Sequence, residues 1–305
     1  MEKKISVLKR WGKGAVLAPI IFSASVFLSV SFAMASQKSH IEDIELPITD
    51  ERDVIDLKVE KRSPPALAQI GSTWEAATDG SLLVFVPAGP FPMGSEDGSA
   101  DEQPVHWVYL DDFWLDQTEV TNSRYALCVE EGVCELPTDP LPLYDKEKVD
   151  HPVVFVDWEG AQTYCEWAGR RLPTEAEWEK AARGTDGRTY PWGDQGDCSR
   201  ANFFDCPEFE ATSPVGFYGE LGVSPYGAYD MAGNVWEWVS DWYGADYYQE
   251  SPHRNPSGPR NGIYHVWRGG SWNCNQTSAR SAGRGNFNPD YWRDLIGFRC
   301  ALDAE

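Results

Sequence analysis

From Gly184 onwards the chain sustains neither the 3.6-residue period of an amphipathic helix nor the two-residue period of a strand. This part of the sequence is rich in Gly, Asp, Pro and aromatic residues instead. Long segments without regular structure are uncommon in a packed domain unless other interactions hold them. We therefore expect aromatic packing, disulfides or bound ions to fix most of the C-terminal half.

Short strands and a first helix are predicted before that segment. Residues 82–95 read as a strand interrupted by prolines, and residues 106–122 contain a second strand region with alternating apolar positions. Thr121 is a suitable N-cap for a helix that ends before Gly132.

Two further helices have clearer signals. Asp157 is a suitable N-cap, Gly169 is a suitable end, and the apolar residues between them follow helical spacing. Thr174 and Glu177 form the S/T-x-x-E capping box of the next helix. The residues predicted to face the core from these two helices are Ala161, Tyr164, Cys165, Ala168, Trp178, Ala181 and Ala182.

Residues 1–35 are predicted to be a signal peptide. Five Lys and Arg residues accompany an apolar run from Ala15 to Phe32, and Ala33-Met34-Ala35 supplies the small residues of a cleavage site. An uncleaved membrane anchor is the alternative, because the run is just long enough. Cleavage predicts a periplasmic or secreted protein without stable membrane insertion. Residues 36–75 are charged and are expected to form a linker or loosely ordered arm before a single domain at 76–305.

The mature chain is predicted to be strongly acidic. Without residues 1–35, the 26 Lys and Arg fall by 5 to 21 and the 48 Asp and Glu fall by 1 to 47, a net charge of −26. Such a surface repels nucleic acid and anionic lipid. Nucleic acid is therefore not an expected partner.

Seven cysteines in an exported chain indicate three disulfides and one remaining thiol. Cys128 and Cys134 lie close together across a predicted helix end, and Cys198 and Cys206 bracket a short loop. Cys274 has no obvious partner and follows two glycines, which permit positive φ or the close approach of another segment. The alternative to a functional Cys274 is an inert buried thiol.

Seven sequence blocks occur in an order that is known from one protein family. They are FPMGS (91–95), EQPVHWVYLDDFWLDQTEVTN (102–122), PVVFVDWEGAQTYCEWAGRRLPTEAEWEKAARG (152–184), YPWG (190–193), YGAYDMAGNVWEWVSDWY (226–243), RGGSW (268–272) and GFRC (297–300). Over residues 82–302 the chain resembles the sulfatase-modifying-factor family, which includes the formylglycine-generating enzymes. The resemblance implies a loop-rich α+β fold, related to C-type lectin-like domains, with little regular secondary structure.

The same resemblance implies a copper chemistry that this chain matches only in part. Formylglycine-generating enzymes hold Cu(I) with two cysteines and use oxygen to oxidise a cysteine of a sulfatase peptide to an aldehyde, and this soft ion favours two thiolates. Cys274 matches the first copper cysteine, while Ser271 and Trp236 match residues that line the active-site groove. No cysteine lies between Cys274 and Cys300 to match the second, so copper is not expected. The resemblance also pairs Cys165 with Cys300.

Calcium is the cofactor that we expect. Asp230 and Glu237 flank a turn whose carbonyl groups at Gly233 and Val235 would complete a set of hard oxygen ligands. The family binds calcium at the matching positions. A weaker second site would begin at Asn202, although its later acidic ligand has no clear match. The five histidines fit neither a zinc pattern nor the His-x-x-x-His-x-Glu iron site of the related sulfoxide synthases.

Two functions remain open at this point. The first is a non-catalytic family member that binds a peptide, glycan or protein partner in the groove near Trp236 and Trp272. The second is an exported oxidase or maturation enzyme that uses Cys274, of the kind that acts on sulfatase cysteines or in siderophore maturation.

Overall fold

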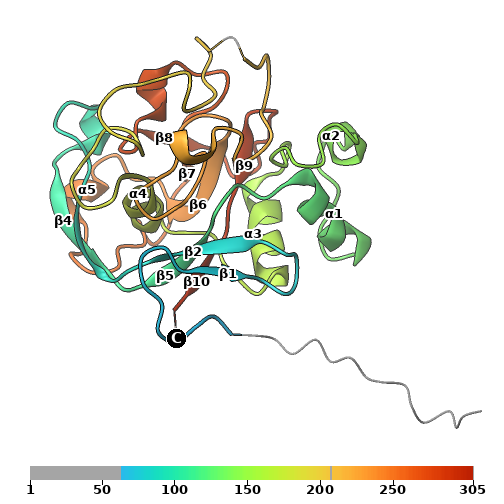
Figure 1. Ribbon diagram of the computed structural model, residues 1–305. Coiled ribbons are helices and arrows are strands. Elements are labelled where there is room, and N and C mark those ends of the chain that lie inside the picture. Colours follow the sequence, from blue (N-terminus) through green and yellow to red (C-terminus); the bar gives the residue numbers. More distant parts are fainter. Residues whose placement is uncertain (1–62, 207, 305) are drawn as a thin grey trace, which may run out of the picture. The chain divides into compact units, whose positions relative to one another are not determined.

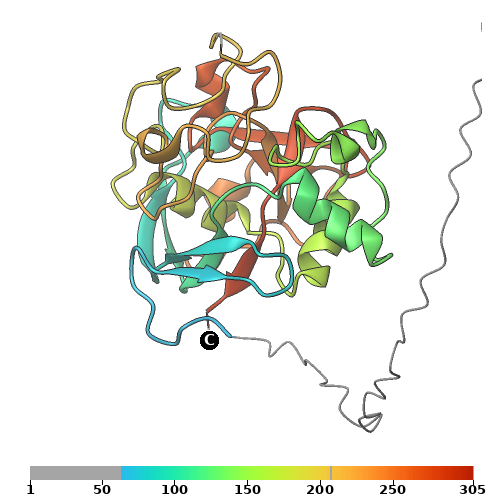
Figure 2. The same cartoon turned by 45° about the vertical axis from the view of Figure 1, so that its right-hand side comes forward.

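The computed structural model describes residues 63–206 and 208–304, so the predictions for residues 1–62 lie outside the described part of the chain. Within it, three small sheets and several short helices are joined by long loops (Figures 1 and 2). This is the loop-rich α+β fold that was predicted. The strands are β1 (Thr73–Glu75), β2 (Leu82–Val86), β3 (Gly89–Met93), β4 (His106–Leu110), β5 (Phe113–Asp116), β6 (Trp236–Trp242), β7 (His265–Arg268), β8 (Arg284–Phe287), β9 (Ile296–Phe298) and β10 (Ala301–Asp303). The helices are α1 (Asn122–Glu130), α2 (Leu141–Tyr144), α3 (Trp158–Trp167), α4 (Glu175–Arg183) and α5 (Tyr247–Glu250), with 3-10 turns at Ala100–Glu102, Gly219–Leu221 and Gln276–Ala279.

The first sheet has the order β1-β2-β5-β10, so both ends of the domain lie in it. Its strand β1 corrects the predicted boundary at residue 76. Trp74 pairs with Leu83 and its ring lies 6.5 Å from that of Trp114. Three residues are too few to display strand alternation, which explains why the predicted arm at 36–75 extended too far.

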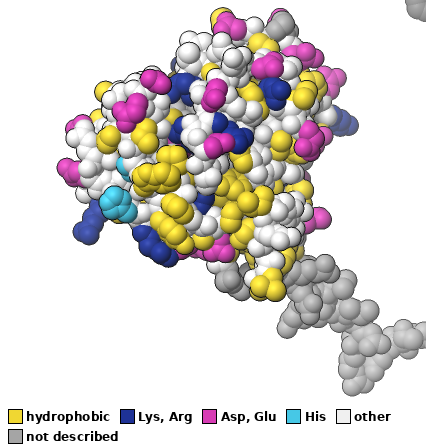
Figure 3. Space-filling model, turned by 60° about the vertical axis from the view of Figure 1, so that its left-hand side comes forward, with side chains coloured by type: hydrophobic (Ala, Val, Ile, Leu, Met, Phe, Trp, Pro, Cys, Tyr) yellow, Lys and Arg dark blue, Asp and Glu magenta, His cyan; other side chains and the backbone are white. Residues whose placement is uncertain are grey.

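The second sheet is the β3–β4 ribbon, which buries one face and exposes the other. On the outer face Pro90 lies opposite Tyr109 and Pro92 lies opposite Trp107. The Trp107 side chain is 61% exposed. Figure 3 shows hydrophobic side chains gathering on this side of the molecule. The prolines also limit further strand pairing, because they lack the backbone N–H donor.

The third sheet has the order β8-β7-β6-β9 and supports the region of interest. Its central strand β6 pairs antiparallel with β7 and parallel with β9, which places Trp236 beside Ile296. Strand β7 ends at Arg268, directly before the two glycines that lead to Cys274. This sheet therefore brings three widely separated segments of the sequence together.

The three predicted helices are confirmed, together with their caps. The side chains of Thr121 and Asp157 accept N-cap hydrogen bonds at α1 and α3, and Thr174 and Glu177 form a reciprocal capping box at α4. Helices α2 and α5 were not predicted, because a four-residue helix is too short to show a period. No helix of the described residues is long and apolar enough to cross a bilayer.

Disulfides and aromatic contacts hold much of the irregular chain. The structure contains the three predicted disulfides, Cys128–Cys134, Cys165–Cys300 and Cys198–Cys206. Between α4 and β6 the described residues form a 3-10 turn and otherwise loops. There the rings of Tyr190 and Trp192 stack with centroids 5.5 Å apart.

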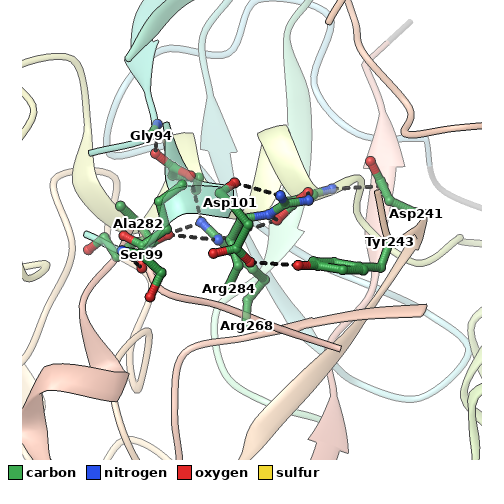
Figure 4. A network of polar contacts seen from close by, with 12 residues as sticks. Gly94, Ser99, Asp101, Asp241, Tyr243, Arg268, Ala282 and Arg284 are labelled. Atoms are coloured by element: carbon green, nitrogen blue, oxygen red, sulfur yellow. Dashed lines mark hydrogen bonds and ion pairs between the residues drawn. The ribbon is translucent and has the colours of Figure 1, made fainter. Parts of the chain in front are cut away.

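A buried network of charges fastens α4 to the third sheet (Figure 4). Arg268 donates to Glu179 at 2.6 Å, and Arg284 donates to both oxygens of Glu175 at 2.7 and 2.9 Å. The Asp241 carboxylate accepts from the backbone N–H of Glu175 at 2.9 Å. Burial, followed by the charge of Glu175, raises the pKa of Asp241 to about 8. Arg268, the last residue of β7, links this network to the glycine turn that follows it.

Candidate functional site

The Gly269–Gly270 turn determines where Cys274 lies. Both glycines have positive φ, +92° and +74°. A Cβ at Gly270 would lie 2.8 Å from Ala279, and one at Gly269 would lie 3.1 Å from the Trp178 ring. Side chains at these two positions would strain the backbone and collide with packed neighbours. Both positions of the turn therefore require glycine.

Beyond the turn, Ser271 and Cys274 come into direct contact. The Ser271 Oγ lies 3.3 Å from the Cys274 Sγ, and the backbone N–H of Cys274 donates to the Ser271 carbonyl at 2.9 Å. Ser271 is fully buried, whereas Cys274 is partly exposed. Cys274 is the free cysteine among the described residues, where the other six form disulfides. No second thiol is thus available beside it.

An aromatic stack adjoins this thiol. Trp236 stacks on Trp267 with ring centroids 5.4 Å apart, and Cys274 packs against the same hydrophobic cluster. The stack continues from Trp267 to Phe287 at 5.4 Å and on to Tyr291 at 3.8 Å. The structure therefore places Ser271 against Cys274, and both Trp236 and Cys274 at the same large hydrophobic cluster.

The segment after Cys274 contains hydroxyl and amide groups that hydrogen-bond to one another. The Asn275 side chain accepts from the hydroxyl of Thr277 and from the backbone N–H and hydroxyl of Ser278. Ala279 is fully buried, and its methyl group lies toward Gly270. These are hard or apolar neighbours, which a soft metal ion disfavours.

A cavity of about 320 Å³ lies beside Trp272. Trp272 donates from Nε1 to the Asp294 carbonyl at 3.1 Å, which fixes the indole ring at the cavity wall. The wall combines aromatic, proline and carboxylate side chains with one lysine, and its charged members are Asp139, Asp145, Lys148 and Asp294. Three carboxylates against one ammonium make the cavity acidic.

Phe155 separates this cavity from a second one of about 340 Å³ and lines both. It has a φ of +62°, a strained conformation for a bulky residue. Its N–H donates to the Arg293 carbonyl at 3.0 Å, and its carbonyl accepts from Thr138 at 3.1 Å. Strained residues held by their surroundings are concentrated at ligand sites. Sequence reasoning missed Phe155, because nothing in the local sequence signals its conformation.

The predicted calcium residues surround a buried carboxyl cluster. Asp230 has a φ of +56° and accepts from the N–H of Gly216 at 2.5 Å. Glu237 accepts from Trp178 at 2.8 Å and from Arg299 at 2.7 and 2.8 Å. Glu237 is therefore already engaged by an arginine, which the sequence did not indicate.

Glu119 is a member of this cluster that sequence reasoning missed. Its carboxyl group lies close enough to Asp230 for the two charges to interact. One oxygen accepts from Asn234 at 2.9 Å, and the other is buried without a partner among the described residues. Burial, and then the Asp230 charge, raise the pKa of Glu119 well above its usual value. Burial raises the pKa of Asp230 to about 6.

These residues fit a hard divalent cation in charge and donor type. Glu119, Asp230 and Glu237 are three carboxyl groups beside the single guanidinium of Arg299, and one oxygen of Glu119 is a hard donor without a hydrogen-bond partner among the described residues. No three Asp, Glu, His or Cys side chains of the described residues converge on one point as a metal site. A cation here would therefore need backbone carbonyls as well, such as those predicted at Gly233 and Val235.

Asn202, the predicted start of a second calcium site, is buried nearby. Its Nδ2 donates to the Ala211 carbonyl at 2.8 Å, and its carbonyl accepts from the N–H of Asn234 at 3.0 Å. Its Oδ1 is buried and has no partner among the described residues. That oxygen is the one acceptor at Asn202 that a cation would use.

The chain is similar to known proteins over most of its length. The family model "Sulfatase-modifying factor enzyme 1-like domain" matches residues 72–304. A formylglycine-generating enzyme of Streptomyces coelicolor is 37% identical over 305 residues, which cover 80% of this chain and 96% of that protein. The structure of PvdO from Pseudomonas aeruginosa superposes with a TM-score of 0.68 at 29% identity, covering 78% of this chain and 100% of PvdO.

A relative of different organisation is also similar. The serine/threonine-protein kinase pkn1 of Chlamydia caviae is 41% identical over 238 residues, which cover 72% of this chain. That match spans only 37% of the kinase, so the likeness concerns one part of a longer protein. With a family model that covers most of its length, the chain belongs to the sulfatase-modifying factor enzyme 1-like (FGE-sulfatase) domain family.

Proposed function

We propose that this chain is a binding member of its family, which engages an extended peptide of a partner in the groove beside Trp272 and does not carry out copper-dependent oxidation. The observation that carries the proposal is the single free thiol of Cys274. Its neighbours are Ser271 and a loop whose hydroxyl and amide groups hydrogen-bond to one another. A single thiolate with hard neighbours is a poor Cu(I) site.

The acidic cavity supports a peptide with a cationic side chain as the ligand. Asp139, Asp145 and Asp294 outnumber Lys148 there, and none of the three aspartates forms an ion pair with a described residue. Trp272 and Phe155 add aromatic walls, on which a guanidinium group can stack. An arginine side chain satisfies both the charge and the stacking surface.

The alternative, an exported oxidase or maturation enzyme, is supported by one observation. Cys274 is a free, partly exposed cysteine whose sulfur contacts a buried hydroxyl, and it is not among the residues that line the cavity beside Trp272. This function would need a substrate sulfur or a metal other than Cu(I).

The three disulfides indicate an oxidising compartment outside the cytoplasm. Within that compartment, we place the mature chain in the periplasm or outside the cell, beginning at Ser36. The intact mass of the exported protein checks the start.

Experiments with a Cys-x-Pro-x-Arg peptide distinguish a binding function from an oxidase function. We expect the protein to bind it, and mass spectrometry to find the cysteine unchanged after incubation with protein, Cu(I) and oxygen. Asp294→Asn should weaken binding about tenfold, since a charge-assisted hydrogen bond is lost. Asp186→Asn, at an exposed aspartate outside the cavity, is the matched control.

Two results would contradict the proposal. Tight one-to-one Cu(I) binding together with aldehyde formation would establish the oxidase function in its place. Equal affinity for the arginine peptide and its neutral citrulline analogue would exclude recognition of the cation. Ala279→Cys is not a suitable rescue variant, because the new sulfur would be buried against Gly270.

We further propose that calcium binds between Glu119 and Asp230, completed by Glu237 and the carbonyl groups of Gly233 and Val235, with Asn202 as the start of a weaker second site. The bound ion would neutralise the excess negative charge of the buried cluster and so stabilise the loop between α4 and β6. Its role would be structural, since the cluster is buried.

The calcium proposal predicts that a rise in pH lowers the free energy of unfolding of the metal-free protein and that calcium raises it. In chelator, the pKa of Asp230 is about 6 in the folded protein, above the value of about 3.9 for an unfolded aspartate. Unfolding then releases a proton, so the free energy of unfolding falls as the pH rises from about 4 to above 6. Calcium at about a hundred times its Kd should raise the free energy of unfolding by about 2.7 kcal/mol.

Thermal melts over this pH range, with calcium or with chelator, measure both effects. Asp230→Asn should remove the calcium response and reduce the pH-dependent loss, the remainder of which comes from other buried carboxyl groups with raised pKa values, such as Glu119 and Asp241. Asp290→Asn, at an exposed position, should keep both. A wild-type melting curve that chelator leaves unmoved, in protein shown to be metal-free by elemental analysis, would rule the site out.

A further inference from the structure

A separate pocket of about 240 Å³ lies between α3, the turn before α4 and strand β6. Helix α3 contributes Trp158, Gln162 and Glu166, which are spaced by four residues and therefore share one helix face. Leu172 closes the floor, and the remaining lining residues are Arg171, Thr174 and Ser240. The groove at Trp272 uses none of these residues.

Trp158 forms a rigid wall of this pocket. One face of its ring stacks on His265, with centroids 3.9 Å apart and planes inclined by 17°. His265 is stacked in turn against Trp242 at 3.8 Å. The Trp158 Nε1 donates to the Val239 carbonyl at 2.8 Å. A ligand that stacks on the other face of Trp158 thus meets a ring that is already fixed, which reduces the entropy lost on binding.

The polar groups around Trp158 offer both donors and acceptors. Gln162 donates to Glu166 at 2.6 Å, which holds the two side chains together and leaves their other oxygens as acceptors. Thr174 accepts from the N–H of Glu177 at 3.2 Å, so its hydroxyl proton is free to donate. Ser240 donates to Asp241 at 3.1 Å and keeps lone pairs for a ligand.

The charges disfavour an anionic ligand. Glu166 would repel an anion. The guanidinium of Arg171 is already paired with Glu177 and Asp303, so it is not available to bind an anion either. A neutral molecule with several hydroxyl groups satisfies the mixed donors and acceptors. The volume suits one ring, since it lies below the range of about 300–1,000 Å³ for drug-sized ligands.

We propose that this pocket binds a single neutral saccharide residue, with the apolar face of the sugar ring on Trp158 and its hydroxyl groups on Gln162, Glu166, Thr174 and Ser240. Leu172 at the floor would contact the ring carbons. The site is independent of the peptide groove, so the chain would join a glycan and a peptide through two separate surfaces.

Saturation-transfer NMR of the exported protein with the methyl glycosides of glucose, galactose, mannose and N-acetylglucosamine tests the site. We expect at least one glycoside to bind at millimolar concentration, with the strongest transfer at its ring protons. Glu166→Ala and Gln162→Ala should each weaken that binding about tenfold, because two hydroxyl contacts lose their acceptors. Trp158→Phe should weaken it while keeping the stack on His265.

The matched controls are Glu159→Ala, an exposed glutamate of the same helix outside this pocket, and Trp107→Ala, an exposed tryptophan of the β3–β4 ribbon. Both should bind as the wild type does. Near-ultraviolet circular dichroism checks that every variant keeps its packed core. The proposal is overturned if no glycoside of the panel binds, or if Glu166→Ala and Gln162→Ala both retain the wild-type affinity.

Discussion

Replacing Cys165 and Cys300 together by alanine is expected to lower the free energy of unfolding by about 5 kcal/mol, since the chain-entropy model assigns more stabilisation to longer loops. The bond joins residues 135 positions apart and ties helix α3 to the segment between β9 and β10. Without it the unfolded chain gains the freedom of almost half the sequence. Both cysteines are fully buried, so their truncation also removes packing.

The pair Cys128 and Cys134 provides the matched control. It closes a separation of only 6 residues, for which the same model gives about 2 kcal/mol. Urea unfolding of the two double variants, with the remaining disulfides verified by non-reducing peptide mapping, measures the difference. Equal losses in the two variants would contradict the loop-length explanation. Mapping that found Cys274 bridged to Cys300 in the wild type would contradict the pairing itself.

Local signals were enough to predict the helices and most early strands. Thr121, Asp157 and Thr174 are N-caps whose hydrogen bonds reach only three residues along the chain, so the relevant information is contiguous in sequence. Strand β1 and helix α2 escaped prediction because each is too short to show a period. The parallel pairing of β6 with β9 depends on contacts about sixty residues apart, which periodicity does not encode.

In the candidate site, too, some contacts could be predicted from local sequence and others could not. The contact between Ser271 and Cys274 follows from a three-residue spacing behind a glycine turn, and sequence could anticipate it. Glu119 reaches Asp230 from 111 positions away, and no local pattern distinguishes it from a surface glutamate. Asp294 and Phe155 likewise meet at one cavity only after folding. The partner of a buried charge is determined by the tertiary fold, because burial is what makes the pairing necessary.

Arg268→Met is expected to cost about 3–5 kcal/mol of folding free energy, because it removes the cation beside Glu179 Oε2 and leaves this buried carboxylate with Arg183 as its one remaining ion-pair partner among the described residues. Arg268 is fully buried and donates to Glu179 at 2.6 Å and to the carbonyl groups of Ser281 and Ala282 at 2.7 and 3.1 Å. Methionine fills much of the space of arginine, so the loss would come mainly from three unpaired acceptors and not from a cavity.

Two comparisons separate charge from packing in this prediction. Arg254→Met removes an ion pair with Asp111 in which both side chains are more than half exposed, and should cost at most about 1 kcal/mol. Adding Glu179→Gln to Arg268→Met removes a buried carboxylate that only Arg183 still compensates, and should recover part of the stability, by about 1–2 kcal/mol. Urea unfolding at pH 7 measures all three variants. If the double variant is less stable than Arg268→Met alone, the cost arises from lost packing around Trp178, whose ring lies 5.4 Å from the Arg268 guanidinium, and not from the buried charge.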